Sequence, residues 1–239
     1  MSLFEKYPND PHHIPGYIAY QARYANNARE SDKFIIELLR RYRSTGSRLL
    51  DIGCSTGNLL RHIRHALPEL DLTGGDLSDA QLLACRCDET LDGIAFEHMD
   101  IKKLLPHSFD ILIANAVLYG FGDADFAVAM ASISRSLRPG GMMIAFDFFH
   151  AFDQDVELVE RSDHFPAGHP LNFRSFRTTK RHLIETGFSK FEFIPFDIPV
   201  RLTAADHPLQ TRTIDVVDHP RLMFRGVISQ PWCHLVAWT

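Results

Sequence analysis

A repeated alternation of short apolar runs and helical patterns constrains the fold of this chain more than any other feature. The apolar runs "RLLDIG", "DLTGGD", "IAFEHMD", "FDILIANAVL" and "MMIAFDFF" follow one another over about 100 residues, with amphipathic segments between most of them. Strands that alternate with helices usually lie parallel in one sheet, with the helices covering both faces. "FDILIANAVL" is apolar on both faces, as expected of a buried parallel strand. The alternation therefore predicts an α/β fold built on a doubly wound sheet.

The regions outside this alternation are less regular. Residues 1–30 are irregular and contain the Pro-rich "PNDPHHIPG", and residues 150–175 are polar and show no clear period. A helix at "TTKRHLIETGF" then leads into a strand at "SKFEFIPFDI", and two short strands are expected around an Asp218-His219-Pro220 turn. The final strand, "WCHLVAWT", has no long crossover helix before it, which predicts an antiparallel pair that closes the sheet. We expect one domain over residues 1–239.

Composition and charge argue against several classes of partner. The net charge of −5 provides no electrostatic footprint for DNA or RNA, and no apolar run approaches the ~20 residues of a membrane helix. The start of the sequence lacks the basic-then-apolar pattern of a signal peptide. The four cysteines and 13 histidines form no metal-ligand spacing, so we expect reduced thiols, no metal site and a cytoplasmic protein.

A glycine-containing turn follows the first predicted strand. In "LLDIGCSTGN", Gly53 and Gly57 stand four residues apart, directly after a run that ends near Asp51. Glycines there permit positive φ and let the backbone approach a ligand, although the same residues could serve only a tight turn. The spacing is neither the G-x-G-x-x-G of dinucleotide sites nor a phosphate-binding P-loop.

Three aspartates recur near the ends of the first three predicted strands. Asp51, Asp76 and Asp100 stand about one strand–helix unit apart, so they are expected to converge on one edge of the sheet. Three carboxylates would repel a pyrophosphate. They suit a ligand that carries hydroxyls, an amine and a positive charge. We expect Asp76 to accept ribose hydroxyls, Asp100 to accept the adenine amine beside Met99 or Ile101, and Asp51 to face an ammonium or sulfonium group.

The ordered motifs resemble those of a known family. "LLDIGCSTGNLL", "GGDLS", "HMDI", "FDILIANAVLYGF" and "LRPGGMMIAFD" are similar, in order, to the motifs of class I S-adenosylmethionine-dependent methyltransferases of the small-molecule type. The resemblance covers residues 48–148 and resumes at "HLIETGF" through the terminal strands. It implies a Rossmann-like sheet of seven mostly parallel strands with an antiparallel C-terminal pair and helices on both faces. Residues 48–148 then form the cofactor-binding core, residues 1–30 an N-terminal lid, and residues 150–175 and 199–227 substrate-side insertions.

The resemblance also implies a set of cofactor-binding residues. Leu77 is expected against the adenine, and Asn115 and Ala116 beside the methionine part. The middle glycine of the family's first motif is Ser55 here, which is tolerable if that residue keeps negative φ. The full predicted set for S-adenosyl-L-methionine and its product S-adenosyl-L-homocysteine is Asp51, Gly53, Cys54, Ser55, Gly57, Asp76, Leu77, Asp100, Ile101, Asn115 and Ala116.

The predicted reaction is methyl transfer to a small molecule by in-line displacement. The sequence "NAVLYGF" after the fourth strand is not the Asn/Asp-Pro-Pro-Tyr that the family uses for amino groups of adenine or glutamine. A hydroxyl acceptor benefits from a general base. His150, just past the fifth strand, is the predicted base, and Tyr119 is predicted to border the same pocket. The lid is expected to contribute His12, His13, Tyr17, Tyr20 and Tyr24.

Two other functions remain open at the level of sequence. One is methylation of RNA or protein, and assays against total tRNA and protein extract would test it. The other is a non-catalytic protein that keeps the fold for ligand sensing, such as S-adenosylmethionine binding, or for assembly. Calorimetry that finds no binding of S-adenosylmethionine or S-adenosylhomocysteine would favour this non-catalytic function. The sequence does not distinguish a monomer from a homodimer, and it identifies neither the acceptor molecule nor the accepting atom.

Overall fold

The computed structural model describes residues 14–151, 153–161, 168–196, 211–216, 219–225 and 232–239, with only the backbone described over 211–225. Its helices are α2 (Ile14–Gln21), α3 (Glu30–Tyr42), α4 (Asn58–Ala66), α5 (Asp79–Arg86), α6 (Asp123–Ser136) and α7 (Phe176–Glu185). Short 3-10 turns are η2 (Ala22–Tyr24), η3 (Glu89–Leu91), η4 (Ile101–Lys103) and η5 (Leu118–Gly120).

The strands follow the predicted alternation and extend beyond it. They are β1 (Arg48–Ile52), β2 (Asp71–Asp76), β3 (Ala95–His98), β4 (Phe109–Asn115), β5 (Leu137–His150), β6 (Val156–Glu160), β7 (His169–Ser175), β8 (Lys190–Pro195), β9 (Thr211–Val216), β10 (His219–Arg225) and β11 (Trp232–Trp238).

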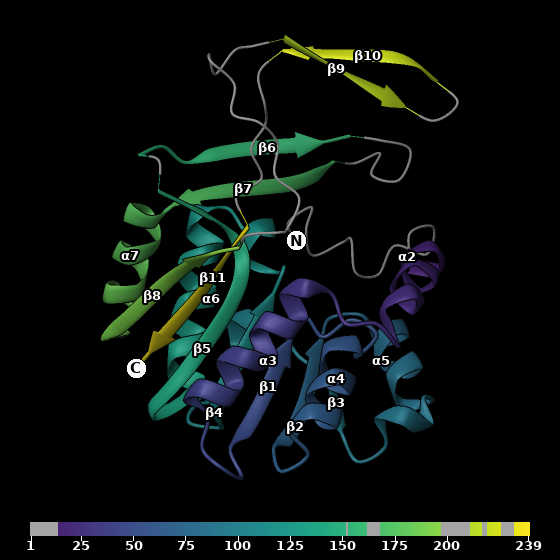
Figure 1. Ribbon diagram of the computed structural model, residues 1–239. Coiled ribbons are helices and arrows are strands. Elements are labelled where there is room, and N and C mark those ends of the chain that lie inside the picture. The colour runs from purple at the N-terminus through teal and green to yellow at the C-terminus, as the bar shows by residue number, and fades with distance from the viewer. Residues whose placement is uncertain (1–13, 152, 162–167, 197–210, 217–218, 226–231) are drawn as a thin grey trace.

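Seven strands form the main sheet, in the order β3-β2-β1-β4-β5-β11-β8 (Figure 1). The five strands from β3 to β5 are parallel, while β11 runs antiparallel to both β5 and β8. The predicted seven-stranded, mostly parallel sheet with an antiparallel C-terminal pair is therefore confirmed. The strand order reverses between β1 and β4, so the carboxyl ends of these two strands border the crevice where such sheets bind ligands.

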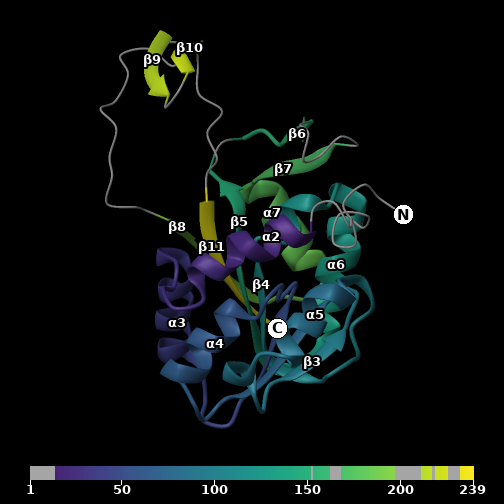
Figure 2. The same ribbon diagram turned by 90° about the vertical axis from the view of Figure 1, so that its right-hand side faces the viewer.

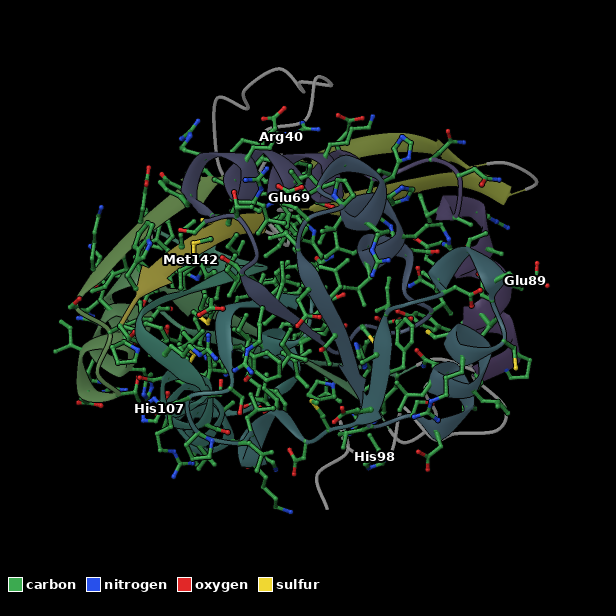
Figure 3. All side chains as sticks on the ribbon, turned by 90° about the horizontal axis from the view of Figure 1, so that it is seen from below. Arg40, Glu69, Glu89, His98, His107 and Met142 are labelled. Atoms are coloured by element: carbon green, nitrogen blue, oxygen red, sulfur yellow. The ribbon has the colours of Figure 1, made fainter. Side chains whose placement is uncertain are left out.

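Two layers of helices cover the two faces of the sheet (Figure 2). On one face, α3, α4 and α5 bury Ile35, Leu60 and Leu82 against side chains of β1, β2 and β4. On the other face, α6 and α7 pack Phe126 and Leu183 against alternate residues of the same sheet. Viewed from below, the side chains fill the space on both sides of the strands, with the labelled Arg40 and Glu89 toward the periphery (Figure 3). This packing holds the strand ends in fixed positions.

The first core helix, α3, begins at Glu30 with Arg29 as its N-cap residue. One predicted region differs from the structure. Residues 150–175 contain the antiparallel pair β6–β7, and β7 joins the end of β5 through Phe149 and His150. The two short strands expected around residues 218–220 are present as β9 and β10, which pair only with each other among the described residues, as a separate two-stranded sheet.

Candidate active site

Two adjoining cavities lie at the carboxyl ends of β1 and β4. The larger has a volume of about 580 Å³ and the smaller about 130 Å³. Residues from α2, the β1–α4 loop and the segment after β4 line both cavities, which therefore form one continuous cleft. The shared residues are Tyr17, Gly53, Ser55, Ala116 and Tyr119.

The loop after β1 is shaped by its first glycine. Gly53 has φ +76°, and a Cβ placed there would lie 2.5 Å from Cγ2 of Val117. Only glycine therefore fits this position. Ser55 also has positive φ, +54°, so the condition under which a serine was expected to be tolerated here, a negative φ, is not met. A non-glycine residue in this region is strained by about 1–3 kcal/mol, and such strain is common at functional sites.

The carboxylate of Asp76 holds the backbone of this loop. The backbone N–H of Ser55 donates to Oδ2 of Asp76 at 2.9 Å, and the other oxygen of that carboxylate accepts from the N–H of Ser78. Burial raises the pKa of Asp76, and these backbone donors oppose the rise. Asp76 is thus fixed at the tip of β2, bordering the smaller cavity, with the remaining lone pairs of its oxygens available to a ligand hydroxyl.

Asp51 is the least satisfied charged group in the cleft. Its side chain is almost fully buried, and its Oδ1 has no hydrogen-bond partner among the described residues. Burial, with the nearby carboxylates of Asp32 and Asp76, raises its pKa to about 8. An unpartnered buried acceptor costs free energy unless a ligand satisfies it, and an ammonium group would do so directly.

A hydrogen-bond network around the start of α3 was not predicted from the sequence. Nδ2 of Asn115 donates to Oδ1 of Asp32 at 3.1 Å, and Nη2 of Arg29 donates to Oε1 of Gln21 at 2.8 Å. Nδ2 of Asn58 donates to the carbonyl oxygen of Gln21. Arg29 is the one cationic side chain among the described residues that line the larger cavity. The cleft therefore offers both a carboxylate and a guanidinium to a zwitterion.

The smaller cavity has a flat, largely apolar lining. Leu77, Met99 and Ile101 line it together with Val117 and Phe121, which suits an aromatic ring. A polar side chain that was not predicted from the sequence also lines it. Gln81 is 5% exposed, and its Oε1 has no hydrogen-bond partner among the described residues.

Two predicted cofactor residues do not line either cavity. Oδ1 of Asp100 accepts from the N–H of Lys102 and caps η4, and Oδ2 lies 3.5 Å from Nζ of Lys103. Gly57, with φ +71°, is the N-cap residue of α4 and packs near Leu91. Both residues shape the surroundings of the site. Cys54 does line the larger cavity, and a hydrogen bond with Cys85, together with burial, raises the pKa of its thiol.

The two predicted catalytic residues lie in different places. Tyr119 lies in η5 and borders both cavities. His150 is buried at the end of β5 and lines neither cavity, so the structure does not bring it to the cleft. From the N-terminal segment, Tyr17 and Tyr20 line the larger cavity, whereas Tyr24 packs against the guanidinium of Arg29. His12 and His13 lie outside the described residues.

Comparisons with known protein sequences find methyltransferases. Residues 50–143 match the family described as a methyltransferase domain. A malonyl-[acyl-carrier protein] O-methyltransferase of Bacillus cytotoxicus is 24% identical over 182 residues, which cover 69% of this chain and 63% of that protein. A trans-aconitate 2-methyltransferase of Methylobacterium nodulans is 34% identical over 124 residues, 51% of this chain and 46% of that protein. The chain thus spans less than two thirds of the length of these relatives.

Solved structures show the same fold. The YcgJ protein of Bacillus subtilis superposes with a TM-score of 0.61 at 14% identity, over 87% of this chain and 97% of that chain. Phosphoethanolamine N-methyltransferase 2 of Haemonchus contortus, solved with S-adenosyl-L-methionine, has a TM-score of 0.59 at 20% identity, over 82% of this chain and 46% of that chain.

The sheet order, the cleft at its reversal point and the ordered motifs define a protein of the class I methyltransferase fold. The predicted fold is thereby confirmed, and the chain is similar to methyltransferases: residues 50–143 match a methyltransferase domain. Over the described ranges, no cluster of three His, Cys, Asp or Glu side chains is arranged to hold a metal ion, and no helix has the length and apolarity to cross a membrane.

Proposed function

We propose that the cleft binds S-adenosylmethionine and that the protein transfers its methyl group to a small organic acceptor. When bound, the cofactor would supply a methyl group on a sulfonium sulfur. An acceptor atom would bond to the methyl carbon in line with the breaking carbon–sulfur bond, and S-adenosylhomocysteine would be the leaving group. The observation that carries the proposal is the unpartnered Oδ1 of Asp51, buried in a cavity that Arg29 also lines. A zwitterionic amino-acid tail would satisfy both groups at once.

The chain's own residues divide the cofactor between the two cavities. In the larger cavity Asp51 would accept from the ammonium and Arg29 would donate to the carboxylate, with Asn115 and Ala116 beside the methionine chain. Asp76, at the boundary, would accept from ribose hydroxyls. In this assignment each protein acceptor faces a donor of the ligand, and each protein donor faces an acceptor, without a metal ion between them.

The smaller cavity would hold the adenine. Leu77 and Ile101 would lie against the ring, and the buried Oε1 of Gln81 would accept from the exocyclic amine. This replaces the role predicted for Asp100, whose carboxylate is engaged by η4.

The acceptor would lie against the aromatic part of the larger cavity. Tyr119, Phe146 and Trp232 line it, and the rings of Phe146 and Trp232 stack with centroids 4.7 Å apart. An apolar, aromatic wall favours an organic small molecule. A hydroxyl acceptor with His150 as its base stays a prediction that the cavity lining does not support.

We also propose a single domain over residues 1–239. The core 48–148 would bind the cofactor, and α2 with η2 would act as the lid predicted for residues 1–30, since Tyr17, Tyr20 and Gln21 line the cleft. Of the two predicted substrate-side insertions, the described part of residues 150–175 lines neither cavity, and much of 199–227 lies outside the described residues.

Two matched carboxylate variants test this function by calorimetry with S-adenosylhomocysteine. Asp76→Asn should weaken binding about 10- to 100-fold, because charge-assisted hydrogen bonds contribute about 1.5–3 kcal/mol. Asp100→Asn, at the tip of the next strand but outside both cavities, should change the Kd less than about threefold. No binding of the nucleoside by the wild-type protein would refute the proposal, and equal losses in both variants would refute the assignment of Asp76.

A further inference from the structure

The segment of residues 116–121, here named the η5 loop, forms the wall that the two cavities share. Ala116 and Tyr119 border both cavities, and Val117 and Phe121 border the smaller one. Ala116 has φ +57°, a conformation that L residues adopt only when their surroundings impose it. The position of this loop therefore decides where a cofactor in one cavity meets an acceptor in the other.

A buried carboxylate on β5 holds the first part of the η5 loop. Oδ2 of Asp147 accepts from the N–H of Leu118 at 2.7 Å and from the N–H of Tyr119 at 3.0 Å, and its Oδ1 accepts from the N–H of Phe148 at 2.8 Å. Asp147 is 1% exposed, so water does not compete for these donors. Burial raises the pKa of Asp147 to about 6, and the three N–H donors and Arg174 oppose the rise, so the carboxylate is mostly ionised at neutral pH.

Two polar side chains on β7 hold the carbonyl oxygens of the same loop. Nδ2 of Asn172 donates to the carbonyl oxygen of Tyr119 at 2.8 Å. Nη1 of Arg174 donates to the carbonyl oxygen of Leu118 at 3.2 Å, and Nη2 donates to that of Phe121. Arg174 is 4% exposed, and its guanidinium lies 4.0 Å from the ring centroid of Phe126, so it too is fixed by packing.

The ring of Tyr119 is placed by the same two strands. Its centroid lies 5.2 Å from that of Phe148 on β5 and 5.6 Å from that of His169 on β7. Backbone and ring are thus both held by β5 and β7. Among the described residues, the hydrogen bonds to the N–H and the carbonyl oxygen of Tyr119 come from side chains, so substitutions can remove them one at a time.

We propose that Asp147, Asn172 and Arg174 are positioning residues that fix the η5 loop, and with it Tyr119, at the boundary between the cofactor and acceptor parts of the cleft. This inference rests on the proposed function for the role of the cleft. It assigns to the β6–β7 pair the task of supporting a wall of the site, through β7, without lining the cleft.

The test follows Tyr119 by ¹⁹F NMR in protein labelled with 3-fluorotyrosine, its resonance being assigned with Tyr119→Phe. The wild-type signal should be a single line that shifts when S-adenosylhomocysteine is added. Asn172→Leu and Asp147→Asn should broaden or split this line and raise the Kd of S-adenosylhomocysteine roughly three- to tenfold, since each removes hydrogen bonds to the loop. Arg174→Met should have the same effects. Arg174→Lys, which keeps a hydrogen-bond donor, should bring the line shape and the Kd part of the way back to the wild-type values.

Thr178→Val provides the matched control. The hydroxyl of Thr178 donates to Asp155 at 2.6 Å, next to the same strand pair, and it makes no hydrogen bond to the η5 loop within the described part of the chain. This variant should leave the ¹⁹F line and the Kd unchanged. Equal effects in Thr178→Val and Asn172→Leu, or no effect in any variant at β5 and β7, would overturn the inference. If Asp147→Asn does not fold, the results for Asn172→Leu, Arg174→Met and Arg174→Lys are sufficient to test the inference.

The two proposals fail in different ways. A wild-type protein that does not bind S-adenosylhomocysteine contradicts the proposed function. Hydrogen exchange at the amides of Leu118 and Tyr119 then still decides whether the loop is held as inferred: faster exchange in Asn172→Leu than in Thr178→Val supports it, and equal exchange overturns it.

Discussion

The raised pKa of Asp51 predicts that cofactor binding releases a proton. With a pKa of about 8, Asp51 is about 90% protonated at pH 7 in the free protein. A bound ammonium group favours the charged carboxylate and lowers this pKa well below 7. Binding of S-adenosylhomocysteine at pH 7 should therefore release about 0.9 proton per site.

The same linkage sets how affinity depends on pH. The ionised fraction of Asp51 rises from about 9% at pH 7 to about 90% at pH 9, so the affinity should increase about tenfold over this interval. The increase ends where the ligand's own ammonium loses its proton. Below pH 7 each further unit should weaken binding by about another factor of ten.

Calorimetry at pH 7 in phosphate and in Tris measures the proton directly, because the two buffers take up protons with different enthalpies. Asp51→Asn should bind more weakly and release close to no proton. Asp71→Asn, at the exposed opposite end of β2, should behave like the wild type. A wild-type protein that releases no proton, or an Asp51→Asn variant that releases as many, would refute the assignment of Asp51 to the ammonium.

Further predictions concern the protein without its cofactor. Because the pKa of Asp51 is raised on folding, its contribution to stability is complete below pH 4 and is lost as the pH rises through 8, by up to about 6 kcal/mol. The free energy of unfolding measured in urea should fall with pH over this range. In Asp51→Asn it should depend less on pH. Gly53→Ala should lower the free energy of unfolding by about 2–4 kcal/mol, because it adds the clash with Val117 to the cost of positive φ. Gly46→Ala, at φ +74° with open space around it, isolates the φ cost, and equal losses in the two variants would contradict the clash. Ser55→Gly should relieve positive φ and raise Tm by about 2–4 °C in a melting experiment, and a lower Tm would count against strain at this residue.

The features that sequence could predict are those that depend on local pattern. The strand–helix alternation predicts a parallel sheet with helices on both faces, because short crossovers of one hand return the chain to the same sheet. The placement of Asp51 and Asp76 at adjacent strand tips follows from the same regularity. Neither depends on which side chains meet across the cleft.

The features that were not predicted from the sequence depend on which hydrogen-bond partner each polar side chain takes in the folded protein. Asp100 stands at the expected strand tip, but a local backbone donor at Lys102 takes up its carboxylate, as often happens where Asp precedes a helical turn. The strand β7 was not predicted because buried polar residues, among them Asn172 and Arg174, interrupt its apolar pattern. The role of Arg29 depends on a network that joins α2, α3 and α4, which no local pattern contains.

The position of β11 has a consequence for how the chain reaches its native state during synthesis. β8 precedes β11 in the sequence, yet it joins the main sheet only through β11, which occupies the place beside β5. Until residues 232–239 have left the ribosome, the outer edge of β5 and the whole of β8 lack their ladder partners. A nascent chain arrested before this point should expose an unpaired sheet edge and recruit chaperones, and the emergence of residues 232–239 should end that exposure.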